Sequence, residues 1–418
     1  MWLPETAVDL ETLEILAEQG IAFTILSPKQ ASRTRPIHDT RWTDVRAGNI
    51  DCSEPYLCRL PSGASIVIFF YEETIAQDVA FSRLLENGEG FAHRMVHYFS
   101  HEQKQSGLLS IASDGETYGH HHRFADMALA YALHHLESGN LARITIYGEY
   151  LSIYPPTHQV EIIENTSWSC PHGVERWRSD CGCCTRGSII QVTPPYPPGH
   201  SPVPETPPGD KYCEIISQQK WRAPLREAMD RLAQELAVLY HERMNSYVSD
   251  PWKARDDYIE VILDRSPGNI EAFFSNHAVR SLSQEDKVQV LKLLEMQRNG
   301  MLMYTSCGWF FENISGIESV QVMRYACRAM QLAREVAGAD PEPEFIHILE
   351  KAPGNVPEHG NGAQVYKKFA RTAVVDLSRA GFHYAVSSLV AGSPETVRIR
   401  NYTLRNDAFE KAESGDLR

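Results

Sequence analysis

The feature that most constrains the fold is a set of short, continuously apolar runs that alternate with helical patterns over the first 150 residues. A run that is apolar at every position predicts a strand buried on both faces, as in a parallel sheet covered by helices. We therefore expect an α/β fold here. The expected strands are IAFTILSP (21–28), ASIVIFFY (64–71) and GLLSIASD (107–114), and the expected helices span 10–20, 74–88 and 91–100.

The C-terminal half is predicted to be mainly α-helical. Apolar residues recur there at steps of three and four, the pattern of amphipathic helices, over 225–239, 285–298 and 319–338. Eight prolines between Pro194 and Pro208 exclude a helix or a central strand and predict an extended loop. We therefore divide the chain into an α/β part (1–165), a Trp/Cys-rich and Pro-rich segment (166–214) and a helical domain (215–418).

The net charge limits the classes of binding partner, and the cysteine content limits the cellular compartment. A formal net charge of −14 argues against nucleic acid or an anionic membrane as the main partner, because both would repel the protein. No run approaches the roughly 18 apolar residues of a membrane-spanning helix, and the start MWLPETAVDL does not resemble a signal peptide. Nine scattered cysteines, an odd number, favour a reducing compartment. We expect a cytoplasmic protein with an uncharged substrate; its oligomeric state cannot be read from the sequence.

Two carboxylates stand out as candidates for chemistry. Asp114 follows the third apolar run, in SDGETYGH (113–120), and the carboxyl ends of strands are where α/β folds place their sites. Glu5 lies in MWLPE at the start. Two carboxylates can cleave a glycosidic bond, one as nucleophile and one as proton donor. From spacing alone, Glu5 fits better as an ordinary acid in a loop or near a helix N-terminus.

The short sequence motifs that contain Glu5 and Asp114 are more specific for a protein family than the spacing of the two residues. WLPE (2–5) and SDGETYGH (113–120) resemble two motifs of glycoside hydrolase family 57. Two further stretches are also similar to that family, YTSCGWFFENISGIESVQ (304–321) and TSWSCPHGVERWRSDCGC (166–183), the latter to its bacterial branch with an uncharacterised helical domain after the barrel. The resemblance implies a partial (β/α)7-type barrel followed by the helical domain. Because other family motifs should precede WLPE, it also implies that the first strands are missing and that the chain is N-terminally truncated.

The resemblance also implies roles for individual residues. The enzyme would hydrolyse or transfer α-glucan chains with retention of configuration, without a cofactor. Glu5 would be the nucleophile and Asp114 the general acid/base, with Glu116 supporting the site and Trp309 closing over an oligo- or polysaccharide. The expected substrate-binding residues are Trp2, Glu116, His120, His121, Trp168, Trp177 and Trp309. To donate a proton near neutral pH, Asp114 needs a raised pKa, which burial beside another carboxylate would provide.

The same residues also fit other functions. Asp114 with His120 and His121 would suit a metal-dependent carbohydrate hydrolase or deacetylase. A truncated chain would also suit a non-catalytic fragment that binds polysaccharide. The C-x-H…C-x-C pattern of Cys170, His172, Cys181 and Cys183 could hold a structural zinc ion, although its spacing is not that of a standard zinc finger. The same loop could instead line the substrate site through its tryptophans, or serve only the structure.

Overall fold

The computed structural model describes residues 1–102, 107–183, 218–392, 395–399 and 402–407. The chain divides into two compact units, residues 1–183 and 184–418. The proline-rich loop predicted between Pro194 and Pro208 lies outside the described residues. No helix in the described ranges is long and apolar enough to span a membrane.

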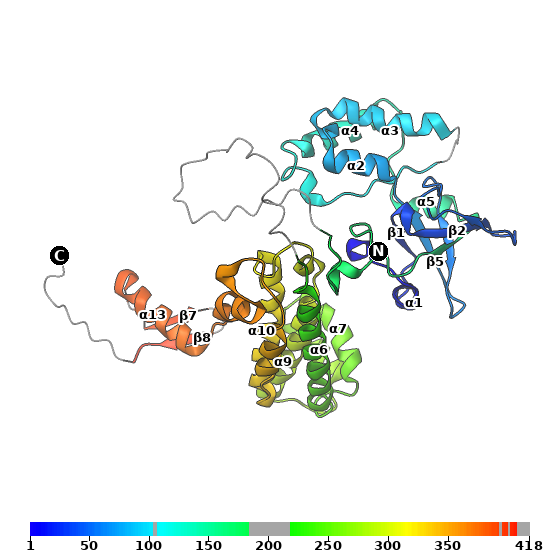
Figure 1. Cartoon of the computed structure of the whole chain (residues 1–418). Coiled ribbons are helices and arrows are strands. Elements are labelled where there is room, and N and C mark those ends of the chain that lie inside the picture. The colour runs from blue at the N-terminus through cyan, green and yellow to red at the C-terminus, as the bar shows by residue number, and fades with distance from the viewer. Residues whose placement is uncertain (103–106, 184–217, 393–394, 400–401, 408–418) are drawn as a thin grey trace, which may run out of the picture. The chain divides into compact units, whose positions relative to one another are not determined.

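The first unit contains a six-stranded sheet in the order β1-β5-β4-β6-β2-β3. Its strands β1, β2 and β5 are labelled in Figure 1. Its strands are β1 (Phe23–Leu26), β2 (Ala31–Pro36), β3 (Thr43–Asp44), β4 (Tyr56–Arg59), β5 (Ser65–Phe70) and β6 (His158–Ile162). Only the pairs β1/β5 and β4/β6 are parallel, and the other three pairs are antiparallel. The predicted all-parallel sheet is therefore wrong. The reason is the short connection between β4 and β5, a hairpin that turns at Gly63 (φ +91°) and needs no crossover helix.

Two of the three predicted strands are present, as β1 and β5. The third, 107–114, is not a strand. Its backbone bonds to two separate segments instead of a ladder: Leu108 N–H donates to Ser53 O at 2.9 Å, and Glu72 N–H donates to Ser110 O at 2.8 Å. The apolar run thus marks a half-buried connection that passes the end of β5.

Five α-helices complete the described part of this unit: α1 (Leu10–Glu18), α2 (Glu73–Phe81), α3 (Gly88–Glu102), α4 (Ala125–Ser138) and α5 (Tyr147–Ile153). Asp9 caps α1, whose buried Leu13 and Leu16 pack in the core formed with the sheet. α2, α3 and α4 share a separate apolar core and form a group of their own (Figure 1). The helices predicted at 10–20, 74–88 and 91–100 correspond to α1, α2 and α3, although α2 ends early, at Phe81.

The second unit is mainly helical, as predicted. Its described helices are α6 (Arg222–Met244), α7 (Pro251–Leu263), α8 (Pro267–His277), α9 (Gln284–Leu302), α10 (Ile317–Ala337), α11 (Glu342–Leu349), α12 (Gly362–Val365) and α13 (Leu377–Ala391). α9 packs against both α6 and α10. Four apolar positions of α6 that gave the helical pattern are buried: Leu225, Met229, Leu232 and Leu236. A hairpin of β7 (Thr396–Ile399) and β8 (Tyr402–Arg405) was not expected.

Candidate active site

Glu5 is held by the Trp168 indole. The indole N–H (Nε1) donates to Glu5 Oε2 at 3.0 Å, a hydrogen bond across 163 positions of the sequence. The backbone N–H of Trp168 also lies within bonding distance of Glu5 O (3.1 Å) and Thr6 Oγ1 (3.0 Å). Trp2 packs edge-on against Trp168 with 5.0 Å between ring centroids, and it is 40% exposed. The carboxylate therefore has a fixed donor beside an accessible aromatic ring.

The backbone that carries Glu5 is strained. Glu5 (φ 57°, ψ 17°) and Thr6 (φ 49°) both lie in the left-handed region, which residues other than glycine rarely adopt. Each such residue costs on the order of 1 kcal/mol and persists only where surrounding contacts hold it. The contact here comes from Gln30, 1% exposed, whose Nε2 donates to Thr6 O at 2.8 Å. Strain maintained in this way is common at functional sites.

This site lies at the carboxyl end of the parallel pair β1/β5. Tyr71 directly follows β5, and its ring centroid lies 5.9 Å from that of Trp168. Gln30, which holds the Glu5–Thr6 turn, lies just beyond the end of β1 in the 3-10 helix Pro28–Gln30. The position agrees with the rule that α/β folds use the carboxyl edge of their parallel strands.

Asp114 comes from the connection that passes the same edge. Ser110 accepts its backbone bond from Glu72, next to Tyr71. Ile111 and Ala112 then pack in the apolar cluster that contains Tyr71 and Trp168. Asp114 follows two residues later and precedes a single 3-10 turn, Gly115–Thr117. The segments that carry Glu5 and Asp114 are thus tied to one cluster of apolar side chains.

The pKa of Asp114 is raised above its ordinary value. The largest cause is partial loss of hydration, although the side chain still reaches solvent, and the second is the negative charge of Glu116. His121 acts in the opposite direction. A general acid needs a change of pKa in this direction, because a raised pKa keeps the carboxyl group protonated to higher pH.

His120 and His121, close to Asp114 in the sequence, are exposed, and the described residues around them form no metal cage. The rings of His120 and His121 lie 5.1 Å apart, and their backbone N–H groups donate to Glu116 O at 3.1 and 2.9 Å. His122 is half-buried, and its Nε2 bonds to Ala80 O at 3.0 Å. In the described ranges, no group of three or more metal-binding side chains includes Asp114 or these histidines.

Two of the tryptophans proposed for substrate binding are buried. Trp309 is 1% exposed inside the helical unit, where its ring lies parallel to that of Tyr304 with 6.5 Å between centroids. Trp177 is 9% exposed within its loop. A ring buried in protein presents no face to a sugar, so these positions do not support the predicted stacking roles.

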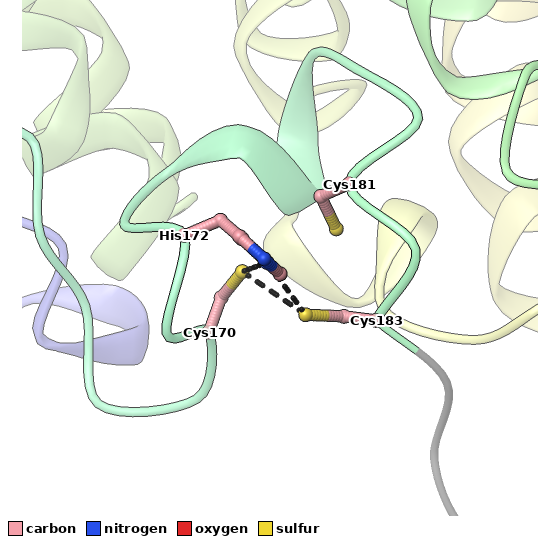
Figure 2. Close-up of side chains that lie close together, drawn as sticks. All are labelled: Cys170, His172, Cys181 and Cys183. Atoms are coloured by element: carbon pink, nitrogen blue, oxygen red, sulfur yellow. Dashed lines mark hydrogen bonds between the residues drawn. The ribbon is translucent and has the colours of Figure 1, made fainter.

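Four potential metal ligands of the first unit do come together. The side chains of Cys170, His172, Cys181 and Cys183 point toward a common centre (Figure 2). One ligand atom from each lies within 4.8 Å of the others, and Cys170 is buried. The sequence pattern therefore corresponds to a cluster in space.

The sequence interpretation missed the residues that shape the Glu5 turn. Gln30, Thr6 and Tyr71 belong to no motif that was recognised. One signal was available for Gln30: Ser27 and Gln30 form a capping box, in which Ser27 N–H donates to Gln30 Oε1 at 2.9 Å. A Ser-x-x-Gln sequence just after a strand is typical of a capping box. Its second role, the bond to Thr6, depends on tertiary structure.

Comparison with known proteins gives results for both parts of the chain. Residues 1–162 match Glycosyl hydrolase family 57, and residues 218–418 match a domain of unknown function, DUF3536. No curated protein matches the sequence. The structure is similar to that of an exo-type maltose-forming amylase from Pyrococcus sp. ST04, with a TM-score of 0.57 and 15% identity over 94% of this chain and 70% of that one. At this identity the likeness concerns the fold alone.

A weaker likeness is to a 4-alpha-glucanotransferase from Thermococcus litoralis, with a TM-score of 0.39 and 12% identity over 80% of this chain and 41% of that one. It supports no conclusion by itself. The match of residues 1–162 agrees with the motifs around Glu5 and Asp114. Residues 1–162 are therefore a domain of glycoside hydrolase family 57, with an enzyme fold of the glycoside hydrolase type, and residues 218–418 match DUF3536.

Proposed function

We propose that the chain hydrolyses or transfers α-glucan chains with retention of configuration, with Glu5 as nucleophile and Asp114 as general acid/base. The observation that carries this proposal is the Trp168 hydrogen bond to Glu5, made beside the apolar cluster from which the Asp114 segment emerges. One solved structure of similar fold is that of a maltose-forming amylase, which agrees with an α-glucan substrate.

In the proposed mechanism, Glu5 attacks the anomeric carbon while Asp114 protonates the departing glycosidic oxygen. The raised pKa of Asp114 favours the protonated form required for this step. In the second step Asp114 removes a proton from water or from a sugar hydroxyl, which then displaces Glu5. Hydrolysis and transfer differ only in which of these acceptors reaches the glycosyl-enzyme. The Trp168 N–H fixes the orientation of the attacking carboxylate.

Several accessible side chains suit a carbohydrate. The exposed ring of Trp2 can stack on the apolar face of a sugar, supported from behind by Trp168. Glu116, His120 and His121 are exposed next to Asp114 and offer hydrogen-bonding groups to hydroxyls.

The finer predictions about architecture are part of the same proposal. We take the mixed sheet of residues 1–165 as part of a (β/α)7-type barrel, 166–214 as a Trp/Cys-rich and Pro-rich segment, and 215–418 as a helical domain. A cytoplasmic location stays a prediction from the cysteine content.

The test is to trap the covalent intermediate. A fluorinated α-glucosyl or α-maltosyl fluoride, which forms the intermediate faster than it is released, should add one glycosyl group to the peptide that contains Glu5. Glu5→Gln should abolish labelling, whereas Glu11→Gln, an exposed acid on α1, should not. Asp114→Asn should depress turnover of natural glucan far more than turnover of a substrate with an activated aryl leaving group, which needs no protonation.

The rival functions predict other outcomes. If glucan bound without turnover or labelling in the unaltered chain, the non-catalytic interpretation would hold. If activity were lost with a chelator and restored by zinc while Glu5→Gln retained it, the metal-dependent interpretation would replace the proposal.

A further inference from the structure

We propose that Cys170, His172, Cys181 and Cys183 bind a single structural zinc ion, which fixes the loop that carries Trp168. This site is separate from the two carboxylates. Its test reads metal content, so it does not depend on the proposed glycosidase function.

The distances between donor atoms approach those of a tetrahedral zinc site. Zinc–sulfur bonds of about 2.3 Å and zinc–nitrogen bonds of about 2.0 Å place donor atoms at the corners of a tetrahedron about 3.5–3.8 Å apart. Cys170 Sγ lies 3.5 Å from Cys183 Sγ and 4.0 Å from His172 Nδ1, and His172 Nδ1 lies 3.1 Å from Cys183 Sγ. Cys181 completes the set within 4.8 Å (Figure 2). Shifts of an ångström or less would close the tetrahedron.

The loop has local features that bring the ligands together. Cys170-Pro171-His172-Gly173 is a tight turn in which Gly173 N–H donates to Cys170 O at 3.0 Å. Proline at the second position and glycine at the fourth are the preferred residues of such a turn. Gly173 has φ +75°, and a Cβ there would collide with Asn165 O. Gly182, between the last two cysteines, also has a positive φ, of +69°. The backbone therefore turns at both pairs of ligands.

The chemistry of the donor set selects zinc. Three thiolates and one imidazole form one of the standard structural zinc sets, and four protein ligands leave no open position for catalysis. Oxygen-preferring ions such as magnesium and calcium are disfavoured by sulfur ligands. A disulfide between Cys170 and Cys183 is the main alternative. It would account for two of the four side chains and would not explain why His172 and Cys181 converge on the same centre.

The site is linked to Glu5 through the chain. Cys170 lies two residues after Trp168, whose indole holds the Glu5 carboxylate. On the other side of Trp168, Val8 N–H donates to Thr166 O at 3.0 Å, so this segment pairs with the strand-like residues after Glu5. Zinc would hold the C-terminal end of the segment and limit its motion against the Glu5–Thr6 turn.

The experiment measures metal in the full chain purified without added chelator. Inductively coupled plasma mass spectrometry should find close to one zinc per chain. Cobalt(II) exchanged into the site should give intense tetrahedral d–d bands and thiolate-to-cobalt charge-transfer bands. Cys183→Ser and His172→Ala should lose the metal, His172→Cys should retain it, and Cys307→Ser, an exposed cysteine of the second unit, should not change it.

A second measurement guards against variants that fail to fold. Zinc removed from the unaltered chain by chelation should speed hydrogen exchange in peptides covering 5–8 and 166–183, and added zinc should reverse the effect. Substoichiometric zinc that is indifferent to Cys183→Ser, or a disulfide between Cys170 and Cys183 in the purified chain, would overturn the proposal. Unchanged exchange after complete zinc loss would overturn its role in fixing the loop.

Discussion

The hydrogen bond between Trp168 and Glu5 gives a prediction whose size follows from the structure. Trp168→Phe removes the indole N–H but keeps an aromatic ring against Trp2 and Tyr71. A hydrogen bond to a charged group contributes about 1.5–3 kcal/mol. Because Glu5 is half-buried and water can replace the lost donor, we expect the lower end, about 1.5 kcal/mol.

A double-mutant cycle isolates that contribution from the smaller size of phenylalanine. The free energy of unfolding is measured for the unaltered chain, Trp168→Phe, Glu5→Ala and the double variant. Hydrogen-exchange mass spectrometry in urea, on peptides from residues 1–183, keeps unfolding of the second unit out of the measurement. The expected coupling is about 1–1.5 kcal/mol. In the assay of α-glucan turnover, Trp168→Phe should lower kcat/KM by about tenfold, the equivalent of roughly 1.4 kcal/mol.

Trp42→Phe provides the matched control, because Trp42 packs against Arg33 and Arg35 and belongs to no candidate site. It should leave kcat/KM unchanged. If the effects of Trp168→Phe and Glu5→Ala on unfolding add to within about 0.5 kcal/mol, the indole does not hold the carboxylate and the reasoning fails.

Three further predictions concern other parts of the first unit. Glu116→Gln removes a charge that raises the pKa of Asp114, so the alkaline limb of the kcat/KM profile, where the acid loses its proton, should move to lower pH; an unmoved limb would exclude Asp114 as the acid. Ile68→Ala, at a fully buried position of β5, should lower the free energy of unfolding by about 2–5 kcal/mol in urea titration, whereas exposed Ser65→Ala should change it by less than about 0.5 kcal/mol. Gly173→Ala, at φ +75°, should weaken zinc retention against a competing chelator; equal retention would show that the turn is not required.

The strands that could be predicted are those buried on both faces. β1 and β5 are apolar at nearly every position, because the sheet core and helical residues cover them. β2 carries exposed polar residues and is stabilised by partners far along the chain, such as the Arg33 ion pair with Glu161 at 2.6 Å. No local sequence pattern predicts pairing between strands so far apart in the chain. The run 107–114 shows the opposite error: its apolar residues are half-buried, and contact with an apolar core does not by itself distinguish a strand from an irregular connection.

In the candidate site, too, local features could be predicted from the sequence and features that depend on tertiary contacts could not. Glu5 and Asp114 could be singled out because short motifs carry them. The left-handed turn at Glu5 and Thr6 could not, since neither residue favours that conformation and a buried Gln30 from another segment imposes it. Likewise, Trp309 could be identified as the aromatic residue of a motif. Its burial could not be predicted, because it depends on the packing of the whole helical unit.

The place of β6 in the sheet bears on how the protein is made. β6 lies between β4 and β2, so without it the sheet falls into two pieces, β1-β5-β4 and β2-β3. Its partners are more than a hundred residues earlier, as the hydrogen bond from Arg35 to Gln159 shows (|i−j| = 124). During synthesis the sheet cannot be completed until residue 162 has left the ribosome. Until then, β4 and β2 each have an unpaired edge on the side where β6 will bind. Unpaired edges attract other chains, and pairing at such long range is slow. The N-terminal unit should therefore depend on a chaperone while it is translated, and a chain cut before His158 should aggregate.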